Sequence, residues 1–256
     1  RVMLYAQGIG PLRRRLSRLL VRLALARMDL ISVRDPGSHD LLRGLGVTRR
    51  VYLTADPVLA WRPALPPNPV RSVLPAEKPY LAVSLRPWPE EERWLPAVAQ
   101  VADRALRSWG MVPVFLPFAR DVDLAVCTRA RARMAEGGQA VILPELGPEE
   151  LYAVVAGAGM VLGMRLHSLI FAALARVPLV GLAYDPKVAA FLSSLGLSAL
   201  AKPLHLSEEE LWASLAGVWA SREEIVARID SSLPALADLA LANARLARGL
   251  VWGREV

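Results

Sequence analysis

The sequence predicts an α/β protein with doubly wound parallel sheets, and three observations support this fold class. Short apolar runs alternate with segments of helical apolar spacing along most of the chain. Strands separated by helices of this length imply right-handed crossovers between parallel strands. The 256 residues, of which 54% are hydrophobic, can form the core of one large domain or of two medium ones.

The first part of this alternation, residues 1–60, is read as three strands and two helices. The expected strands are 2–6, 31–35 and 51–59, and the expected helices are 12–27 and 38–45. About 60 residues are few for a complete doubly wound domain, since domains typically span about 100–150 residues. We therefore expect this N-terminal half to be incomplete in the chain.

Residues 61–79 contain six prolines and are the clearest linker in the sequence. After it the alternation restarts in a second domain, expected over 80–206, and C-terminal helices follow within 207–256. The expected strands are 80–86, 111–117, 140–144, 160–163 and 178–183. The expected helices are 94–109, 122–136, 148–157, 166–176, 187–195, 207–220 and 222–252.

The formal net charge of +7 favours an anionic partner, whether nucleic acid, a phosphorylated substrate or an anionic membrane face. Aromatic residues do not interleave with basic ones, which argues against nucleic acid. The single cysteine excludes an internal disulfide framework and a cysteine-based zinc site, and it suits a reducing cytoplasm. No apolar stretch reaches the roughly 18–20 residues of a membrane span, so we expect a soluble, cytoplasmic protein.

Two polar residues, Arg165 and His167, interrupt the most apolar run of the chain, residues 161–185. The expected strand 160–163 ends directly before them and a helix begins at once, so the pair lies at a strand-to-helix turn. Ligands of open α/β sheets bind at this carboxyl edge, where a helix N-terminus and an arginine suit an anion and a histidine can carry a proton. The alternative is a structural ion pair for the arginine and a satisfied first-turn position for the histidine.

Arg86 ends another expected strand and directs a second cation to the same edge. The alternative for this residue is a surface pairing with the acidic run Glu90–Glu92. Two aspartates are expected to cap helices, Asp121 after one strand and Asp185 after another. Tyr184 and Asp185 are also weaker candidates for substrate contacts.

The first half of the chain offers further candidates at its own strand ends. Gln7 follows the first expected strand, Arg34 lies near the end of the second, and both are candidate substrate contacts. Asp35 and Ser38 are expected to be helix caps, and Asp56, directly before a proline, is expected to form a turn.

The expected helix 12–27 carries a leucine face and an opposite arginine face. The ordinary interpretation is a packed helix whose arginines are solvated. The alternative is a helix that lies on an anionic membrane. The arginines are Arg13, Arg14, Arg15, Arg18, Arg22 and Arg27.

Motifs for metal ligation, for a Walker phosphate loop and for a serine nucleophile elbow do not occur in the sequence. His39 and His205 lack the partner spacing of a metal site. We therefore expect a reaction that needs no metal ion.

Several segments taken together resemble the bacterial polysaccharide pyruvyl transferases, in particular the branch that modifies the cell-wall polymers holding the surface layer. The similarity runs in order from residue 1 to about residue 197. Members of this family carry a glycine-rich segment and further strands before the first of the segments that match, YAQGIGPL. The segments are YAQGIGPL, ISVRDPGS, TADPVL, SLRPW, GMRLHSLIFAA and VPLVGLAYDPKVAAFLSSLG.

This resemblance implies two Rossmann-like halves resembling the GT-B glycosyltransferases, with phosphoenolpyruvate as donor and no further cofactor. It implies a saccharide acceptor, often a terminal N-acetylmannosamine and often lipid-linked, and hence a place at the inner membrane face. The product is a pyruvate ketal bridging two hydroxyls, with release of phosphate. By the same resemblance, Arg86, Arg165 and the backbone of Leu166 bind the donor. His167 binds it as well and acts as a general acid to the methylene or to the departing phosphate.

Two other functions compete with this one. A GT-B glycosyltransferase using a nucleotide sugar would need an acidic residue on the ribose, and the available candidate, Asp185, is already explained as a cap. A saccharide-binding fragment without activity is the second alternative.

Overall fold

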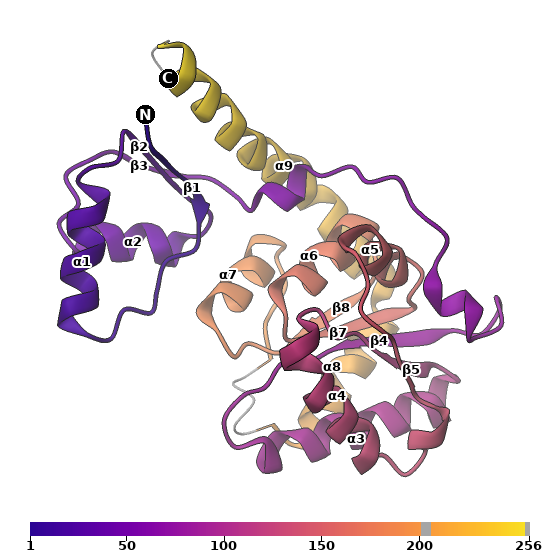
Figure 1. Cartoon of the computed structure of the whole chain (residues 1–256). Helices are drawn as coiled ribbons and strands as arrows, with labels where there is room; N and C mark the ends of the chain where they lie inside the picture. The colour runs from indigo at the N-terminus through magenta and orange to yellow at the C-terminus, as the bar shows by residue number, and fades with distance from the viewer. Residues whose placement is uncertain (201–205, 254–256) are drawn as a thin grey trace. The chain divides into compact units, whose positions relative to one another are not determined.

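The computed structural model describes residues 1–200 and 206–253, which leaves His205 outside it (Figure 1). The chain divides into two compact units. Unit 1 consists of Arg1–Arg62 together with Ser232–Val256, and unit 2 is Pro63–Ser231. The last helix, α9 (Arg222–Trp252), continues from unit 2 into unit 1. In the described ranges, no helix is long and apolar enough to cross a membrane.

Unit 1 is built on a parallel sheet with the strand order β1-β2-β3 within the described residues. The strands are β1 (Met3–Gln7), β2 (Leu30–Val33) and β3 (Val51–Leu53), and the helices are α1 (Arg15–Leu25) and α2 (Pro36–Gly44). Every residue of β2, the central strand, is buried. The core comprises Leu25, Ile31, Val33, Leu42 and Leu45.

The third strand of unit 1 is much shorter than the expected 51–59. It ends at Leu53, and a 3-10 helix follows over Pro57–Ala60. Asp56 causes the break, since its carboxylate accepts a hydrogen bond from the N–H of Val58 (3.1 Å). An aspartate before a proline therefore starts a new turn here, as the sequence indicated.

Helix α1 differs from its ordinary interpretation as a packed amphipathic helix. Among its residues only Leu25 is buried, and four of its leucines are exposed. The core contacts come instead from Val21 and Leu25, which lie on the opposite side of the helix from Leu16. The leucine face of α1 is thus directed away from the core of unit 1.

Unit 2 contains a parallel sheet with the order β6-β5-β4-β7-β8 in the part of the chain that the structure describes. The strands are β4 (Tyr80–Ser84), β5 (Val112–Phe115), β6 (Val141–Ile142), β7 (Met160–Gly163) and β8 (Leu179–Gly181). The helices are α3 (Glu91–Trp109), α4 (Arg120–Arg133), α5 (Pro148–Ala156), α6 (Leu166–Ala175), α7 (Pro186–Ser194) and α8 (Glu208–Ala220).

Helices cover both faces of the unit 2 sheet, with α3 and α4 on one side and α5 and α6 on the other (Figure 1). All five residues of β4 are buried, as expected of a central strand in a doubly wound sheet. The direction of winding reverses between β4 and β7, and such a switch point is where open α/β sheets bind ligands.

The proline-rich stretch is ordered against unit 2 over its second part. Val70 is fully buried, and Asn68 donates a hydrogen bond to the hydroxyl of Tyr80 (2.8 Å). The fit is tight, because a Cβ added at Gly157 would lie 2.3 Å from the side-chain nitrogen of Asn68. This part of the expected linker 61–79 therefore belongs to the packed body of unit 2.

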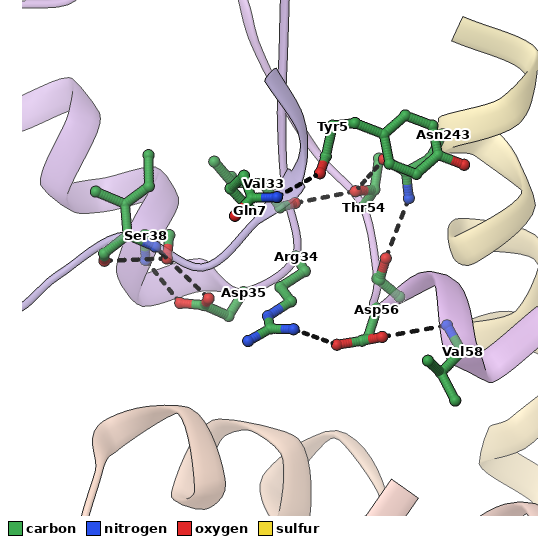
Figure 2. Close-up of polar contacts among 12 residues, drawn as sticks. Tyr5, Gln7, Val33, Arg34, Asp35, Ser38, Thr54, Asp56, Val58 and Asn243 are labelled. Carbon is green, nitrogen blue, oxygen red and sulfur yellow. Dashed lines mark hydrogen bonds and ion pairs between the residues drawn. The ribbon is translucent and has the colours of Figure 1, made fainter. Parts of the chain in front are cut away.

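The expected C-terminal segment 207–256 divides between the two units. In unit 2, Trp212 of α8 stacks on Trp109 of α3 with ring centroids 4.5 Å apart. In unit 1, Asn243 of α9 joins the ends of β2 and β3 (Figure 2). Its Oδ1 accepts from Ser32 Oγ (2.7 Å) and Thr54 Oγ1 (2.9 Å), and its Nδ2 donates to the carbonyl of Ala55 (3.1 Å).

Candidate functional site

The candidate site of unit 2 lies at the carboxyl ends of its two central strands. Ser84, the last residue of β4, pairs in register with Gly163, the last residue of β7. Arg86 follows the first of these strands and Arg165 follows the second. The structure therefore brings the two predicted arginines to neighbouring strand ends, at the switch point of the sheet.

Arg165 forms a bidentate ion pair with Asp123, a residue that sequence reasoning did not single out. The Nε–Oδ2 distance is 3.0 Å and the Nη2–Oδ1 distance is 2.5 Å. The carboxylate of Asp123 is fully buried, whereas the arginine side chain keeps 23% of its surface exposed. A guanidinium has five N–H donors. The ion pair therefore fixes the direction of Arg165 and leaves its Nη1 group for another acceptor.

Asp123 also takes the role that was predicted for Asp121. Helix α4 begins at Arg120, two residues before the expected start, so Asp121 does not occupy the cap position and is exposed. The Oδ2 of Asp123 instead accepts a hydrogen bond from the N–H of Ala119, the residue directly before the helix (2.8 Å). Asp123 lies only two positions after Asp121 in the same segment, 117–123, and this second aspartate was the signal in the sequence that could have revealed the contact.

Arg86 is a cation held by aromatic rings, and no carboxylate pairs with it among the described residues. Its Nη1 donates to the hydroxyl of Tyr184 (3.0 Å), and its guanidinium lies 4.6 Å from the centre of that ring. The ring centre of Trp88 lies 5.9 Å from the Arg86 guanidinium, and the Trp88 and Tyr184 rings pack edge to face. This cluster gives Tyr184 a defined role, which is to hold Arg86.

The alternative pairing of Arg86 with the acidic run Glu90–Glu92 is wrong. Each of these glutamates pairs with a different arginine, because α3 turns them toward its own surface and toward α4. The pairs are Glu90 with Arg93, Glu91 with Arg129 and Glu92 with Arg133.

Two buried polar atoms at this edge have no hydrogen-bond partner in the described structure, the Oγ of Ser84 and the Nε of Arg86. A buried polar atom without a partner costs about 1–3 kcal/mol, so such atoms call for an explanation. The Nε of Arg34 and the Nε1 of Trp94 are also buried without a partner, so this feature is not confined to the sheet edge of unit 2.

The turn from β7 to α6 is closely packed. A Cβ at Gly163 would lie 2.6 Å from Ser168 Oγ and 2.7 Å from Leu169 Cδ2, so glycine allows the helix to start next to the strand. The side chain of Arg165, the residue at the N-cap position, does not cap α6, whose first residues are Leu166 and His167. Its first backbone N–H groups, with the partial positive charge of the helix N-terminus, suit an anion. The side chain of His167 is exposed.

Asp185 caps α7, as its position before a proline predicted. Its Oδ1 accepts a hydrogen bond from the N–H of Lys187 (2.9 Å), and Pro186 occupies the first helical position.

The environment of Asp123 also affects the one cysteine of the chain. Cys127 lies one helical turn further along α4 and is buried. Burial, and secondly the negative charge of Asp123, raise the pKa of its thiol to about 12. The thiol is therefore protonated at neutral pH and is a packing residue.

The corresponding strand ends of unit 1 form a polar network of their own (Figure 2). Arg34, after β2, donates from Nη1 to Asp56 Oδ2 (2.5 Å). Asp35 caps α2 by accepting from the N–H of Ser38 (2.7 Å), as predicted. Gln7 at the end of β1 is exposed and donates to the carbonyl of Tyr5 (3.2 Å). The structure thus places Gln7 and Arg34 in unit 1, where Asp56 neutralises the charge of Arg34.

Within residues 1–200 and 206–253, no three His, Cys, Asp or Glu side chains gather as the ligands of a metal ion would. The metal-independent reaction stays a prediction.

The family of the chain follows from a comparison of its sequence with known families. A model described as polysaccharide pyruvyl transferase matches residues 1–186. This chain belongs to the polysaccharide pyruvyl transferase family. For this pyruvyl transferase family member, the match includes β1 to β8 and the turns that carry Arg86, Arg165 and His167. No match to the chain was found among the curated proteins.

Solved structures show the fold class of this pyruvyl transferase family member. A proposed UDP-N-acetylglucosamine 2-epimerase from Listeria monocytogenes is similar with a TM-score of 0.66 and 14% identity, over 94% of this chain and 63% of that one. The Anabaena protein HepE in complex with UDP and glucose is similar with a TM-score of 0.61 and 15% identity, over 98% of this chain and 72% of that one. The expected α/β, Rossmann-like fold, resembling GT-B enzymes, is thereby confirmed.

Proposed function

We propose that this protein transfers a pyruvyl group from phosphoenolpyruvate to two hydroxyls of one sugar in a cell-wall polysaccharide. The family match supports a polysaccharide acceptor. The resemblance to the branch that modifies polymers of the surface layer supports a terminal N-acetylmannosamine. The single observation that carries the donor proposal is Arg86, a partly buried cation at the carboxyl end of β4 that no described carboxylate neutralises.

The donor carries a carboxylate and a phosphate, and the unit 2 edge offers a group for each. Arg86 contributes a full positive charge and a buried Nε that lacks an acceptor. Arg165 contributes Nη1 from a guanidinium that Asp123 holds in a fixed direction. The N-terminus of α6, with the backbone of Leu166, adds N–H donors. Two separated cationic groups are suited to a small dianion or trianion such as this donor.

The reaction adds one proton to the methylene carbon of the donor, which becomes a methyl group and leaves positive charge on the adjacent carbon. A sugar hydroxyl bonds to that carbon and loses its proton. The bond to the phosphate oxygen then breaks, inorganic phosphate leaves, and the second hydroxyl closes the ketal and loses its own proton. We assign His167 as the general acid, because it lies on the helix turn directly after Arg165 and its side chain is exposed.

In this proposal the reaction needs no metal ion and no cofactor beyond the donor, and it takes place in the cytoplasm. The saccharide acceptor is lipid-linked, which brings the protein to the inner face of the membrane. Gln7 and Arg34 of unit 1 are proposed as contacts of the acceptor. Tyr184 is proposed to contact the donor while it holds Arg86, and Asp185 contributes through the start of α7.

The nucleotide-sugar alternative receives less support from the site. Asp185, the acidic candidate for a ribose contact, already has a structural role, because its Oδ1 accepts the hydrogen bond of the α7 cap. The names of the structural neighbours include UDP, but identities of 14–15% support the fold alone.

Calorimetric titration with phosphoenolpyruvate tests the donor proposal. We expect saturable binding that Arg86→Ala weakens about 10–100-fold, which corresponds to the loss of hydrogen bonds to a charged group. The matched control is Arg93→Ala, which removes an exposed arginine paired with Glu90 in the same unit. Binding of UDP-sugars in place of phosphoenolpyruvate would indicate a glycosyltransferase. Donor binding without phosphate release, in the presence of an acceptor, would indicate a saccharide-binding fragment.

A further inference from the structure

The leucine face of α1 is the largest apolar feature that the donor site does not explain. Leu16, Leu19, Leu20 and Leu23 are exposed by 65%, 49%, 56% and 47%. They lie within one face of the helix, since successive residues turn by about 100°. The core of unit 1 is contacted from the other side of the helix. Clustered leucines on one exposed helix face indicate an interaction surface.

Arginines border this face along one side. Arg15 and Arg22 lie roughly a third of a turn around the helix from Leu16. Arg18 lies between them and the core side, and further arginines precede and follow the helix. In the described structure, none of these arginines has an ion-pair partner. The side of the leucine face is therefore lined with unneutralised positive charge.

The arginines of α1 have no acidic residue close to them in the sequence that could neutralise their charge. No acidic residue occurs between Gln7 and Met28, and Asp29 is the first one after the helix. Asp29 itself accepts a hydrogen bond from the N–H of Val2 (2.7 Å). A leucine face beside a purely cationic stripe complements a surface that is apolar inside and anionic at its border.

We propose that α1 lies on an anionic phospholipid bilayer, with its leucines at the boundary of the acyl chains and its arginines at the headgroup phosphates. Helices of this composition bind parallel to the membrane surface. Eleven residues, about 16 Å of helix, are too short to span a bilayer, so the contact is peripheral. A second protein would need an acidic border matched to one side of α1, whereas an anionic bilayer supplies it in every orientation.

This inference deepens the proposed function by naming the surface that faces a lipid-linked acceptor. It rests on the contacts of α1 and not on donor chemistry. Donor binding is measured without lipid, and vesicle binding is measured without donor, so that failure of one proposal is distinguishable from failure of the other.

Vesicle sedimentation of the full chain tests the proposal. The vesicles are phosphatidylcholine alone, or phosphatidylcholine with about 30 mol % phosphatidylglycerol. We expect binding to the anionic vesicles and little binding to the neutral ones. Each arginine replaced, as in Arg15→Gln or Arg22→Gln, lowers the partition coefficient about fivefold, because each cation near the surface contributes about equally.

The decisive variant is Leu16→Gln, Leu20→Gln and Leu23→Gln together, for which we expect at least a tenfold loss of binding to the anionic vesicles. The matched control replaces two exposed leucines of α9, Leu239→Gln and Leu241→Gln, which are exposed by 43% and 44%. The control should bind as the parent does.

Three results would overturn the proposal. The first is unchanged vesicle binding by the leucine variant, which would reduce the contact to surface charge. The second is a melting temperature of the lipid-free leucine variant several degrees below that of the control, which would show that protein covers these leucines. The third is a lipid-free oligomer that the leucine variant dissociates, which would make a second copy of the chain the occupant.

Discussion

The two units place an arginine at the same position of the same kind of sheet, yet the two arginines differ in their surroundings. Arg34 follows the central strand of unit 1 and binds Asp56, whose carboxylate is almost fully buried. Arg86 follows the central strand of unit 2 and binds a phenol and two aromatic rings. The presence or absence of one carboxylate thus separates a structural arginine from one that is available to an anion.

The hydroxyl groups near these arginines show the same difference. In unit 1, Ser32 and Thr54 both reach the side chain of Asn243. In unit 2, Ser84 ends its strand with a buried hydroxyl that has no partner in the described structure. The two hydroxyls of unit 1 therefore have a side-chain partner and the hydroxyl of unit 2 has none, although each unit also contains a buried arginine Nε without a partner. The predictions that follow test this contrast.

The largest expected effect is on turnover. His167→Ala should lower the rate of phosphate release about 10²–10⁴-fold, which is the usual contribution of a general acid. Donor affinity should fall much less than turnover, because the arginines and the N-terminus of α6 remain. The matched control is His39→Ala in unit 1, where the histidine is half-buried at the start of α2. Equal turnover of both variants would remove the acid role from His167.

The second effect is on stability. Asp123→Ala leaves Arg165 partly buried without its carboxylate, so we expect the free energy of unfolding to fall by about 3–5 kcal/mol. Asp56→Ala should also destabilise the protein, since it removes the partner of Arg34. Donor affinity distinguishes the two variants, because it should fall in Asp123→Ala and stay unchanged in Asp56→Ala. Urea unfolding and calorimetry make the measurement, and equal donor affinity in both variants would contradict the contrast.

The third prediction concerns replacement of Arg86 or Arg34 by methionine. Arg86→Met should weaken donor binding about 10–100-fold with little change in stability, since it removes one hydrogen bond to the Tyr184 hydroxyl and leaves no buried carboxylate without its cation. Arg34→Met should do the reverse, because it leaves the carboxylate of Asp56 buried without its cation. A loss of stability in Arg86→Met equal to that in Arg34→Met would show that Arg86 is structural.

A smaller effect is expected from the hydroxyl groups. Ser84→Ala should cost no stability and should weaken donor binding a few-fold, in line with one neutral hydrogen bond of about 0.5–1.5 kcal/mol. Thr54→Val keeps the shape of its side chain and should lower the free energy of unfolding by about 1 kcal/mol, because Thr54 Oγ1 is hydrogen-bonded in unit 1. Thermal melts with and without donor would distinguish these outcomes.

The last prediction is confined to alkaline pH and concerns Cys127, whose thiol lies near Asp123 in unit 2. Because its pKa in the folded state is raised from 9.0 to about 12, the folded protein binds this proton more tightly than the unfolded chain. The stability it contributes is fully present below pH 9 and is lost as the pH rises toward 12. Urea unfolding across this range should show the loss in the parent. Cys127→Ala should show a smaller loss, and the rest comes from Tyr80, whose pKa is also raised by burial.

Local patterns made several features predictable. Asp35 and Asp185 were recognised as caps because a cap and its partner lie two or three residues apart. The alternation of strands and helices likewise predicted the parallel sheets of both units, and the strand ends placed Arg86 and Arg165 on neighbouring strands. Helix periodicity also revealed the two faces of α1, but it did not reveal which of them is packed.

The sequence by itself determined the fold class and the candidate residues at the sheet edges, since both depend on periodicity and on neighbours within a few positions. The tertiary structure decided which charges meet. Asp123 lies 42 residues from Arg165, and Asn243 lies 189 residues from Thr54. Those contacts depend on strand order and helix placement, which bring distant residues together through the packing of the whole unit. The same packing left Arg86 without a carboxylate and turned the leucines of α1 away from their core.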